Sequence, residues 1–562
     1  MEMEKKNIAI IVLAIALIGS GIGNILFAAN MGLLQITAPK VPDTLVYGTM
    51  YGPDDMDPQL AWDSASFDAL LQVYEGLFAY NYSDPNLAII PMLAEDFGEW
   101  SGNNYTVPLK EGVTFHDGHK FNATAVQWSF NRLAWFTNAS GTLPNNATCF
   151  LSYITVLYTW ANDSLPIINR TEIVDEYTIK FVLNRPCGIF VPLLTFTASW
   201  ILSPYSTPKY NYIQTAEATP QNVVGTGPFK FVGYMAGVEA RFKNFHDYHR
   251  GNASIENLIF NVIQDSDARN NALLSGDINI LLDPHPDYYS TMDSDSNIEL
   301  IDAGAGTTTQ YLGFNNPLYN ITWRNAMSYA LNYQYMIDEL LDGQAVRMLS
   351  PIPPGIRFSN WTYDCPTYNI TKAREYIVSM GFGDMSWEDS QWETAATTSP
   401  FLTVNFTYNL GNKFREDMYT LLKDNYADIG IKVEDNGLEW GPYLNYLYGD
   451  PEKLSIWFIG WMPDYNDPQN YINSLMSNIS SSNSAQINDP YLEELMLDGM
   501  LETDQDAREG IYWEIQRYTV EELRPWAYGY VGKNHDAWAS YVKGYPSNAM
   551  AYAYFYPVYF EA

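Results

Sequence analysis

Residues 460–468 read Gly-Trp-Met-Pro-Asp-Tyr-Asn-Asp-Pro (GWMPDYNDP) and follow the apolar run LSIWFI at residues 454–459. The run has the length and the apolar content of a buried strand. Asp464 therefore stands just past a buried strand, where a carboxylate is costly unless something pairs with it. A cationic group of a ligand would be such a partner. The alternative is that Asp464 and Asp467 are turn residues that cap the following helix.

The composition excludes one broad class of function. The chain has 562 residues, enough for about two to four domains. Its net charge is −35 and its sequence pI is near 4.3, which argues against nucleic-acid binding because that needs a basic surface. The acidity is typical of a soluble, self-repelling surface.

The N-terminus has the pattern of a membrane-targeting segment. Lys5 and Lys6 precede an apolar run from Ile8 to Ala29, which would span about 33 Å as a helix and so could cross a bilayer. We expect residues 1–30 to be an uncleaved membrane anchor, with a cleaved signal segment as the alternative, and residues 31–42 to be a linker. The two lysines place the N-terminus in the cytoplasm and the body outside the cell, at its surface.

Glycosylation motifs agree with that orientation. The chain has thirteen Asn-x-Ser/Thr sequons, which predict glycan attachment on an outer surface, although Asn-rich loops also produce sequons freely: Asn81, Asn104, Asn122, Asn138, Asn146, Asn162, Asn169, Asn252, Asn320, Asn360, Asn369, Asn405 and Asn478. A glycosylated, acidic, anchored protein without a lipoprotein cysteine is more typical of archaea than of bacteria. Cys149 and Cys187 are candidates for a disulfide in such a compartment.

Alternating strand and helix patterns predict an α/β protein with several sheets. Periodicity and turn residues predict strands at residues 44–48, 105–109, 178–183, 227–232 and 255–263, and helices at 66–75, 122–135, 265–275, 324–342, 370–380, 413–429 and 507–523.

Ten short motifs, in order along the chain, resemble those of the family 5 extracellular solute-binding proteins, the peptide-binding type of ABC-importer receptor. The clearest are YEGL at 74–77, LKEGVTFHDG at 109–118, GTGPF at 225–229, RNAMSYALN at 324–332 and GWMPDYNDP at 460–468. The resemblance covers residues 43–545. Each motif alone is weak evidence, but ten in the right order are specific.

The resemblance implies a two-lobed periplasmic-binding-protein-like fold, class II of the large peptide-binding type, with an extra α/β domain and here an N-terminal transmembrane helix. By this analogy lobe I combines 43–76, 201–302 and 526–562, the extra domain is 77–200, and lobe II is 303–525. The chain would cross between lobes near Asp302–Gly306 and near Leu523–Pro525. Gly304 and Gly306 would suit a hinge.

The resemblance also implies ligand-binding residues. In peptide-binding members an Asp at the place of Asp464 pairs with the free α-amino group of the ligand. Trp461 would line a side-chain pocket, Gly460 would leave backbone groups free for an extended peptide, and Tyr465 is a further candidate. Trp62 would meet the ligand from the other lobe. Phe458 stands where some members carry an Arg for the ligand carboxylate, which puts recognition of that group in doubt.

We therefore predict a receptor, not an enzyme, that captures oligopeptides by hinge closure and delivers them to two permease subunits and two ATPases. No catalytic motif is present. No cofactor is expected, and no metal, because His116/His119 and His246/His249 lack a third ligand nearby. Two alternatives remain: an oligosaccharide-binding receptor, favoured by an aromatic content of 15%, or a structural protein that assembles into a surface layer or filament.

Overall fold

The structure is a computed structural model that describes residues 43–61, 63–138, 152–160 and 165–561. The predicted membrane anchor at 1–30 and the linker at 31–42 lie outside these residues. Within the described ranges no helix is both long and apolar enough to cross a bilayer.

One eleven-stranded sheet extends through both halves of the molecule, in the order β10-β11-β12-β1-β13-β19-β14-β18-β16-β17, with β15 beside β19. In its first part β10 and β11 form an antiparallel hairpin next to β12, and β1 runs parallel to both β12 and β13. The elements of this lobe are β1 (Thr44–Thr49), α3 (Ser64–Leu70), β10 (Phe229–Met235), β11 (Glu239–Asn244), β12 (Asn257–Val262), α7 (Ser266–Ser275), β13 (Ile280–Leu282) and α8 (Tyr289–Ser294).

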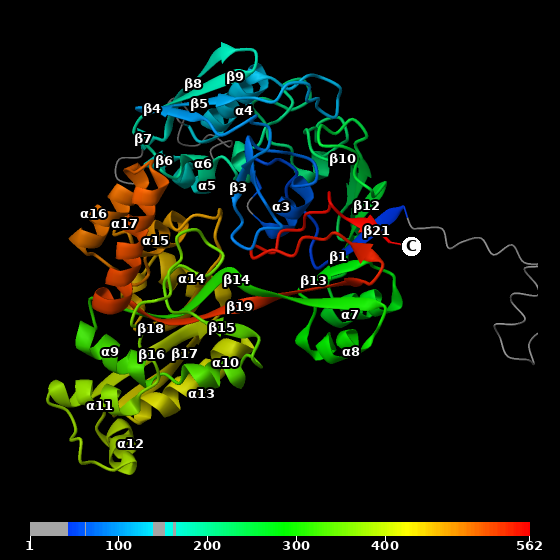
Figure 1. Ribbon diagram of the computed structural model, residues 1–562. Helices are drawn as coiled ribbons and strands as arrows, with labels where there is room; N and C mark the ends of the chain where they lie inside the picture. Colours follow the sequence, from blue (N-terminus) through cyan, green and yellow to red (C-terminus); the bar gives the residue numbers. More distant parts are fainter. Residues whose placement is uncertain (1–42, 62, 139–151, 161–164, 562) are drawn as a thin grey trace, which may run out of the picture.

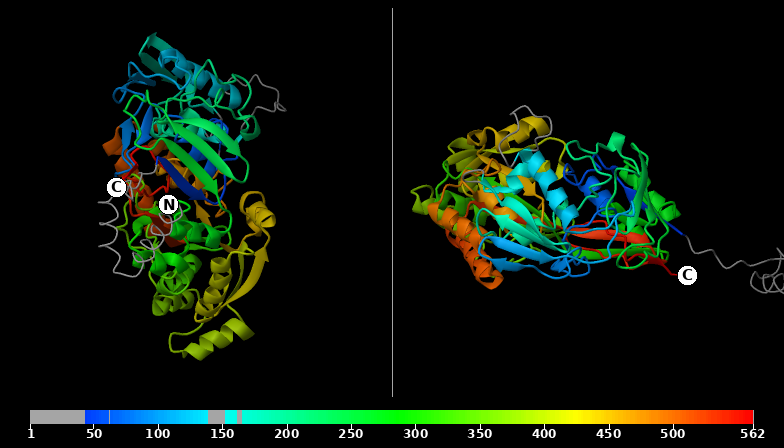
Figure 2. Two further views of the ribbon diagram at one scale, coloured as in Figure 1. Left: turned by 90° about the vertical axis from the view of Figure 1, so that its right-hand side faces the viewer. Right: turned by 90° about the horizontal axis from the view of Figure 1, so that it is seen from above.

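A second, four-stranded sheet in the order β4-β5-β9-β8 lies at the end of the molecule farthest from α11 and α12 (Figure 1; Figure 2, left). Along β5 and β9 every second side chain is buried, so that Tyr105, Val107, Ile179 and Phe181 share one buried core with α4. The segment from Phe78 to Ser199, which contains this sheet, comprises β2 (Phe78–Tyr80), β3 (Ile89–Pro91), β4 (Glu99–Ser101), β5 (Asn104–Pro108), α4 (Ala123–Phe136), α5 (Ser152–Leu157), β6 (Thr159–Trp160), β7 (Leu165–Pro166), β8 (Ile168–Asp175), β9 (Thr178–Leu183), α6 (Phe190–Leu193) and a 3-10 turn, η1 (Thr197–Ser199).

The other lobe holds the far part of the large sheet between two groups of helices (Figure 1). Its strands are β14 (Ile298–Phe314), β15 (Ala345–Arg347), β16 (Leu402–Asn409), β17 (Ile431–Leu438), β18 (Ile456–Trp461) and β19 (Trp526–Ala539). Its helices are α9 (Ile321–Ala330), α10 (Tyr333–Asp338), α11 (Ile370–Ser379), α12 (Asp389–Thr398), α13 (Lys413–Ala427), α14 (Trp440–Tyr448), α15 (Gln469–Met476), α16 (Pro490–Leu501), α17 (Gln505–Arg517) and a π-helical turn, η5 (Tyr518–Leu523).

The long strands β14 and β19 run side by side between the lobes (Figure 1). Their register shifts between Asp302 and Gly304 and again between Ala305 and Thr309, where the sheet passes from one lobe to the other. The expected crossing at 302–306 falls on these register shifts. Residues 530–532 of β19, which follow the other expected crossing at Leu523–Pro525, pair with β15. The division into lobes stays a prediction.

The two predicted hinge glycines each satisfy a geometric need. Gly304 has φ +79°, which side chains rarely adopt. A Cβ at Gly306 would stand 2.7 Å from Oδ1 of Asn534 on β19. The role of both residues in closure stays a prediction.

Asparagine side chains begin several helices. Asn122 Oδ1 accepts hydrogen bonds from the backbone of Thr124 (3.0 Å) and Ala125 (3.3 Å), as a helix N-cap does. The prediction of one helix over 324–342 is wrong, because another asparagine begins a new helix within that range. Leu331 is extended, and Asn332 caps a new helix through Tyr335 N (3.0 Å).

The described sequons are all accessible to some degree. Asn146 and Asn162 lie outside the described residues, and none of the other eleven sequon asparagines is buried. At Asn122, Asn320 and Asn369 the side-chain oxygen caps a helix. Glycan attachment at any of these sites stays a prediction.

Cys187 is buried and has no disulfide partner among the residues that the structure describes, and burial raises the pKa of its thiol to about 12. Its predicted disulfide partner, Cys149, lies outside the described residues, so the disulfide stays a prediction. Among the described residues no group of three or more His, Cys, Asp or Glu could hold a metal ion.

Candidate ligand-binding site

Asp464 is held in place by one residue of the next helix, Asn470 on α15. The Asn470 amide donates to Asp464 Oδ2 (2.8 Å), and its Oδ1 accepts from the Asp464 backbone N (3.1 Å) and from Trp461 Nε1 (3.1 Å). The end of β18 and the start of α15 thus fix the direction of the carboxylate.

The Asp464 carboxylate has no ion-pair partner among the described residues. Burial raises its pKa from 3.8 to about 6, against the opposing effect of the Asn470 hydrogen bond. A half-buried carboxylate that accepts a hydrogen bond from a single side-chain amide is poorly compensated. It is therefore prepared to pair with a cation that the chain itself does not supply.

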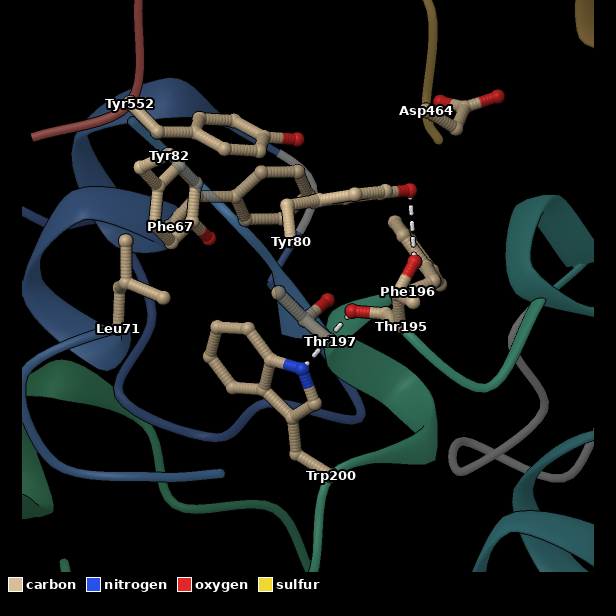
Figure 3. Close-up of a pocket in the computed structure, with 10 residues that line it drawn as sticks. All are labelled: Phe67, Leu71, Tyr80, Tyr82, Thr195, Phe196, Thr197, Trp200, Asp464 and Tyr552. Atoms are coloured by element: carbon tan, nitrogen blue, oxygen red, sulfur yellow. Dashed lines mark hydrogen bonds between the residues drawn. The ribbon is translucent and has the colours of Figure 1, made fainter. Parts of the chain in front are cut away.

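Asp464 is one of the residues that line a pocket with about 20 Å³ of free space (Figure 3). Five separate segments supply its walls: α3 with the residue after it, the strand β2 with the turn after it, residues 195–200 around η1, the turn after β18, and the C-terminal segment. The lining residues are Phe67, Leu71, Tyr80, Tyr82, Thr195, Phe196, Thr197, Trp200, Asp464 and Tyr552. An apolar, concave site with a few polar groups is typical of small-ligand binding.

Tyr80 joins the two sides of this pocket. Its hydroxyl forms a 2.6 Å hydrogen bond with Thr195 Oγ1 and accepts from the backbone N of Asn466 (2.9 Å) across the cleft. The Asn466 amide also donates to Asn86 O (3.2 Å). These bonds connect the segment after β18 with the β2–β3 region, so the lobes are closed over the pocket.

A second compartment with about 30 Å³ of free space adjoins the first and shares five of its lining residues, Leu71, Tyr80, Tyr82, Thr195 and Trp200. Its one charged residue is Glu75, which is buried. The Glu75 carboxylate accepts from Thr226 Oγ1 (2.7 Å) and Tyr248 Oη (2.7 Å), and His249 Nε2 lies 3.1 Å from both of its oxygens. It is already satisfied by the protein.

The other sequence-predicted residues lie around the pocket and are absent from its lining. Trp461 is half-buried against Asn470. Tyr465 is 1% exposed and packs into the core of the extra domain. Gly460 pairs with Gln310 on β14, and pairing of β18 with β16 stops at Trp457, so no strand covers its other edge. Trp62 lies outside the described residues.

Asp467 has a different role from Asp464. Its carboxylate accepts from Gln469 N (2.9 Å) at the start of α15 and binds the Arg508 guanidinium through both oxygens (2.7 and 2.6 Å). Asp467 thus bonds the first backbone N–H of α15, although the N-cap residue of that helix is Pro468. Phe458 is fully buried beside Phe414 and Tyr530, so that position offers nothing to a ligand carboxylate.

The sequence analysis did not identify most of the residues that line the pocket, namely Phe67, Leu71, Tyr80, Tyr82, Thr195, Phe196, Thr197 and Trp200. Residues 551–555 form no strand; Tyr552 lines the first compartment and Tyr554 the second.

Comparison with known proteins identifies the family to which the chain belongs. The family described as "Bacterial extracellular solute-binding proteins, family 5 Middle" matches residues 88–483. Heme-binding protein A of Haemophilus influenzae is 26% identical, covering 94% of this chain and 95% of its own. Di/tripeptide-binding protein 1 of Pseudomonas aeruginosa is 27% identical, covering 85% and 87%.

A solved structure shows the same architecture. The ABC transporter-associated periplasmic binding protein DppA from Helicobacter pylori, in complex with the peptide STSA, has a TM-score of 0.71 and 25% identity, covering 92% of this chain and 98% of its own. The predicted α/β peptide-binding-protein fold is thereby confirmed.

Proposed function

Because the chain belongs to the family 5 extracellular solute-binding proteins, we propose that it captures oligopeptides in the interlobe pocket and delivers them to an ABC importer. Members of this family are transport receptors, so the chain is not an enzyme. The observation that carries the peptide assignment is the Asp464 carboxylate, which is half-buried at an apolar pocket and has no ion-pair partner among the described residues. An α-ammonium group would neutralise it.

Binding would proceed by closure of the lobes over the ligand. A ligand shifts the open–closed equilibrium only by its differential affinity for the closed state. In the closed arrangement Tyr80 and Asn466 bring the walls of the pocket together around Asp464. Permease subunits and ATPases would then receive the closed receptor.

The pocket favours a peptide over an oligosaccharide. A sugar needs several polar partners along its ring edges, since buried hydroxyls cost free energy unless hydrogen-bonded. The lining offers mainly phenyl, phenol and indole faces with two threonines. An aromatic face alone also suits sugars, so the oligosaccharide receptor remains an outcome of the test below.

For the setting of the receptor, we propose a body held outside the cell by the segment at residues 1–30 and carrying glycans on its sequons. The apolar run and the two lysines before it support this. The relatives named above are bacterial and give no support to an archaeal source, which stays a prediction. Assembly into a surface layer is the competing structural role, and a monomeric chain at micromolar concentration would argue against it.

A thermal-shift screen of the purified chain tests the proposal. Three pools are compared: short peptides, the same peptides N-acetylated, and oligosaccharides. Ligand at 100 times its Kd adds about 2.7 kcal/mol of stability, which gives a readable rise in Tm. We expect a rise with free-amine peptides alone. A rise with oligosaccharides alone would transfer the chain to the sugar receptors.

Peptide affinity should depend on pH through Asp464. The free receptor holds this carboxyl at a pKa of about 6, and pairing with an ammonium requires the ionised form. The ligand amine, with an ordinary pKa of about 7.7–8.0, is protonated throughout the acidic range. We expect the affinity to fall by about tenfold from pH 7 to pH 5, as measured by calorimetry. An Asp464→Asn variant should lack this dependence, and a flat wild-type profile would contradict the assignment.

A further inference from the structure

The extra domain, residues 77–200, contacts both predicted lobes, and its two interfaces differ in kind. Toward lobe I it is held by a buried ion pair, in which the Arg132 guanidinium on α4 donates to both oxygens of Asp57. Both side chains are 0% exposed, and Arg132 Nε also donates to Pro208 O (2.8 Å). A bidentate arginine–carboxylate pair is a strong and geometrically specific contact. We therefore expect this interface to stay together when the lobes move.

Toward lobe II the extra domain makes apolar contacts and two hydrogen bonds that involve backbone groups. Tyr465 and Met500 pack into the core of the extra domain. Gly188 N donates to Met500 O (2.7 Å), and Asn466 N donates to Tyr80 Oη (2.9 Å). All the groups in these contacts are neutral. They can therefore separate and form again without leaving a buried charge uncompensated.

The closed arrangement leaves little space between the walls of the pocket. Its two compartments hold about 20 and 30 Å³ of free space, which is room for about one or two water molecules each. A residue of a peptide, or a sugar ring, can therefore enter only after the walls have moved apart. The contacts of the extra domain with lobe II must open for this, because Tyr80 belongs both to the pocket wall and to one of these contacts.

We propose that the extra domain is a latch: it is fixed to lobe I and holds lobe II closed through the bonds Gly188–Met500 and Tyr80–Asn466 and the buried side chain of Tyr465. The latch keeps the receptor mainly closed before a ligand arrives, so that its opening controls ligand entry. The apparent affinity of any ligand is then reduced by the fraction of receptor that is open. The inference uses the predicted division into lobes and is independent of the chemical class of the ligand.

If the latch opens as one unit, weakening one of its two hydrogen bonds must loosen the other. Hydrogen exchange of the full chain without ligand, read by mass spectrometry, measures this at the peptides that contain Gly188 and Asn466. Tyr80→Phe leaves the Asn466 N–H without its acceptor in the closed state. We expect exchange to become about 5- to 150-fold faster at both peptides, the Gly188 peptide included. The matched control is Tyr158→Phe, which removes a buried hydroxyl that bonds Ser199 (2.6 Å) inside the extra domain and should leave both rates unchanged.

A Gly188→Ala variant opens the latch from its other contact. A Cβ at Gly188 would stand 1.9 Å from Glu502 O, so it must push the turn between α16 and α17 away from the extra domain. We expect faster exchange at the Asn466 peptide and a larger radius of gyration in small-angle X-ray scattering. The control is Gly510→Ala on α17, because Gly510 is exposed and a Cβ there would meet nothing within 4 Å. Peptides from β9 should exchange as in the wild type, which shows that the fold is intact.

The outcomes separate the latch from the function of the receptor. An exchange rate that rises at only one of the two contacts, or a Gly188→Ala chain with the radius of gyration of the wild type, would overturn the inference and leave the proposed function standing. If Gly188→Ala also loses the protection of β9, that variant is unfolded and Tyr80→Phe decides alone. No ligand enters these measurements, so a failure of peptide capture would be seen only in the thermal-shift screen.

Discussion

An Asp464→Asn receptor is expected to bind a free-amine peptide about 30- to several-thousand-fold more weakly than the wild type. The pocket is closed and apolar, so the ligand ammonium would be left without its counter-charge. Losing one partner of such a buried pair typically costs about 2–5 kcal/mol, which sets that range of affinity. Asparagine is nearly isosteric, and its side-chain oxygen can still accept from Asn470, so the pocket should keep its shape.

Calorimetry with each peptide and its N-acetylated form measures this effect. The acetylated peptide has no ammonium, so its weak binding should hardly change. The control variant is Asp424→Asn, which removes an exposed carboxylate on α13 and should leave both affinities as they are. Equal weakening of the two forms by Asp464→Asn would show that the carboxylate acts on pocket structure and not on the ligand amine.

The same substitution should increase the stability of the ligand-free chain. Burial raises the pKa of Asp464 from 3.8 to about 6, so the folded state favours the protonated form. Ionisation above pH 6 therefore carries a penalty of at most about 3 kcal/mol, which asparagine would avoid. The gain should be fully present above pH 6 and disappear below about pH 4, where the carboxyl is protonated in both states. A residue that costs stability and serves binding is typical of a functional site.

The sequence could indicate Asp464 because a carboxylate just past an apolar strand has few ordinary explanations. It could not separate Asp464 from Asp467, which stand in the same short motif. The difference comes from Arg508, 41 residues beyond Asp467, which packing brings to one carboxylate and not to the other. Long-range partners of this kind leave no local signal.

The same limit explains the missed walls. Phe67, Tyr80, Thr197 and Tyr552 come from four segments that meet only in the closed structure. The apolar run predicted that β18 is buried. It did not indicate into which hydrophobic core each aromatic residue after β18 packs. Tyr465 enters the extra domain, while Trp461 stays beside Asn470. Sequence patterns predicted correctly those features that neighbouring residues determine, such as the Asn122 helix cap and the strand Thr178–Leu183.

Removal of the Arg508 guanidinium should be the most damaging single change to stability near the site. Arg508 and Asp467 are both 0% exposed, joined by two hydrogen bonds, and Arg508 Nε also donates to Gly499 O (2.8 Å). The pair lies where α16 meets the extra domain, since Gly188 N donates to Met500 O (2.7 Å) there. Removing one partner of a buried ion pair leaves the charge of the other partner buried and uncompensated.

We expect Arg508→Met to lower the free energy of unfolding by about 3–5 kcal/mol, measured by urea denaturation. The double variant Arg508→Met/Asp467→Asn should recover a large part of that loss, because no charge is then left buried. Lys413→Met, which breaks the exposed pair with Asp417 on α13, is the control and should change little. If the charges matter, removing both partners leaves no uncompensated charge, so the two losses of stability should not add. A double variant whose loss equals the sum of the two single losses would therefore contradict this. It would show that the contacts around the pair, and not its charges, hold α16 and α17 against the extra domain.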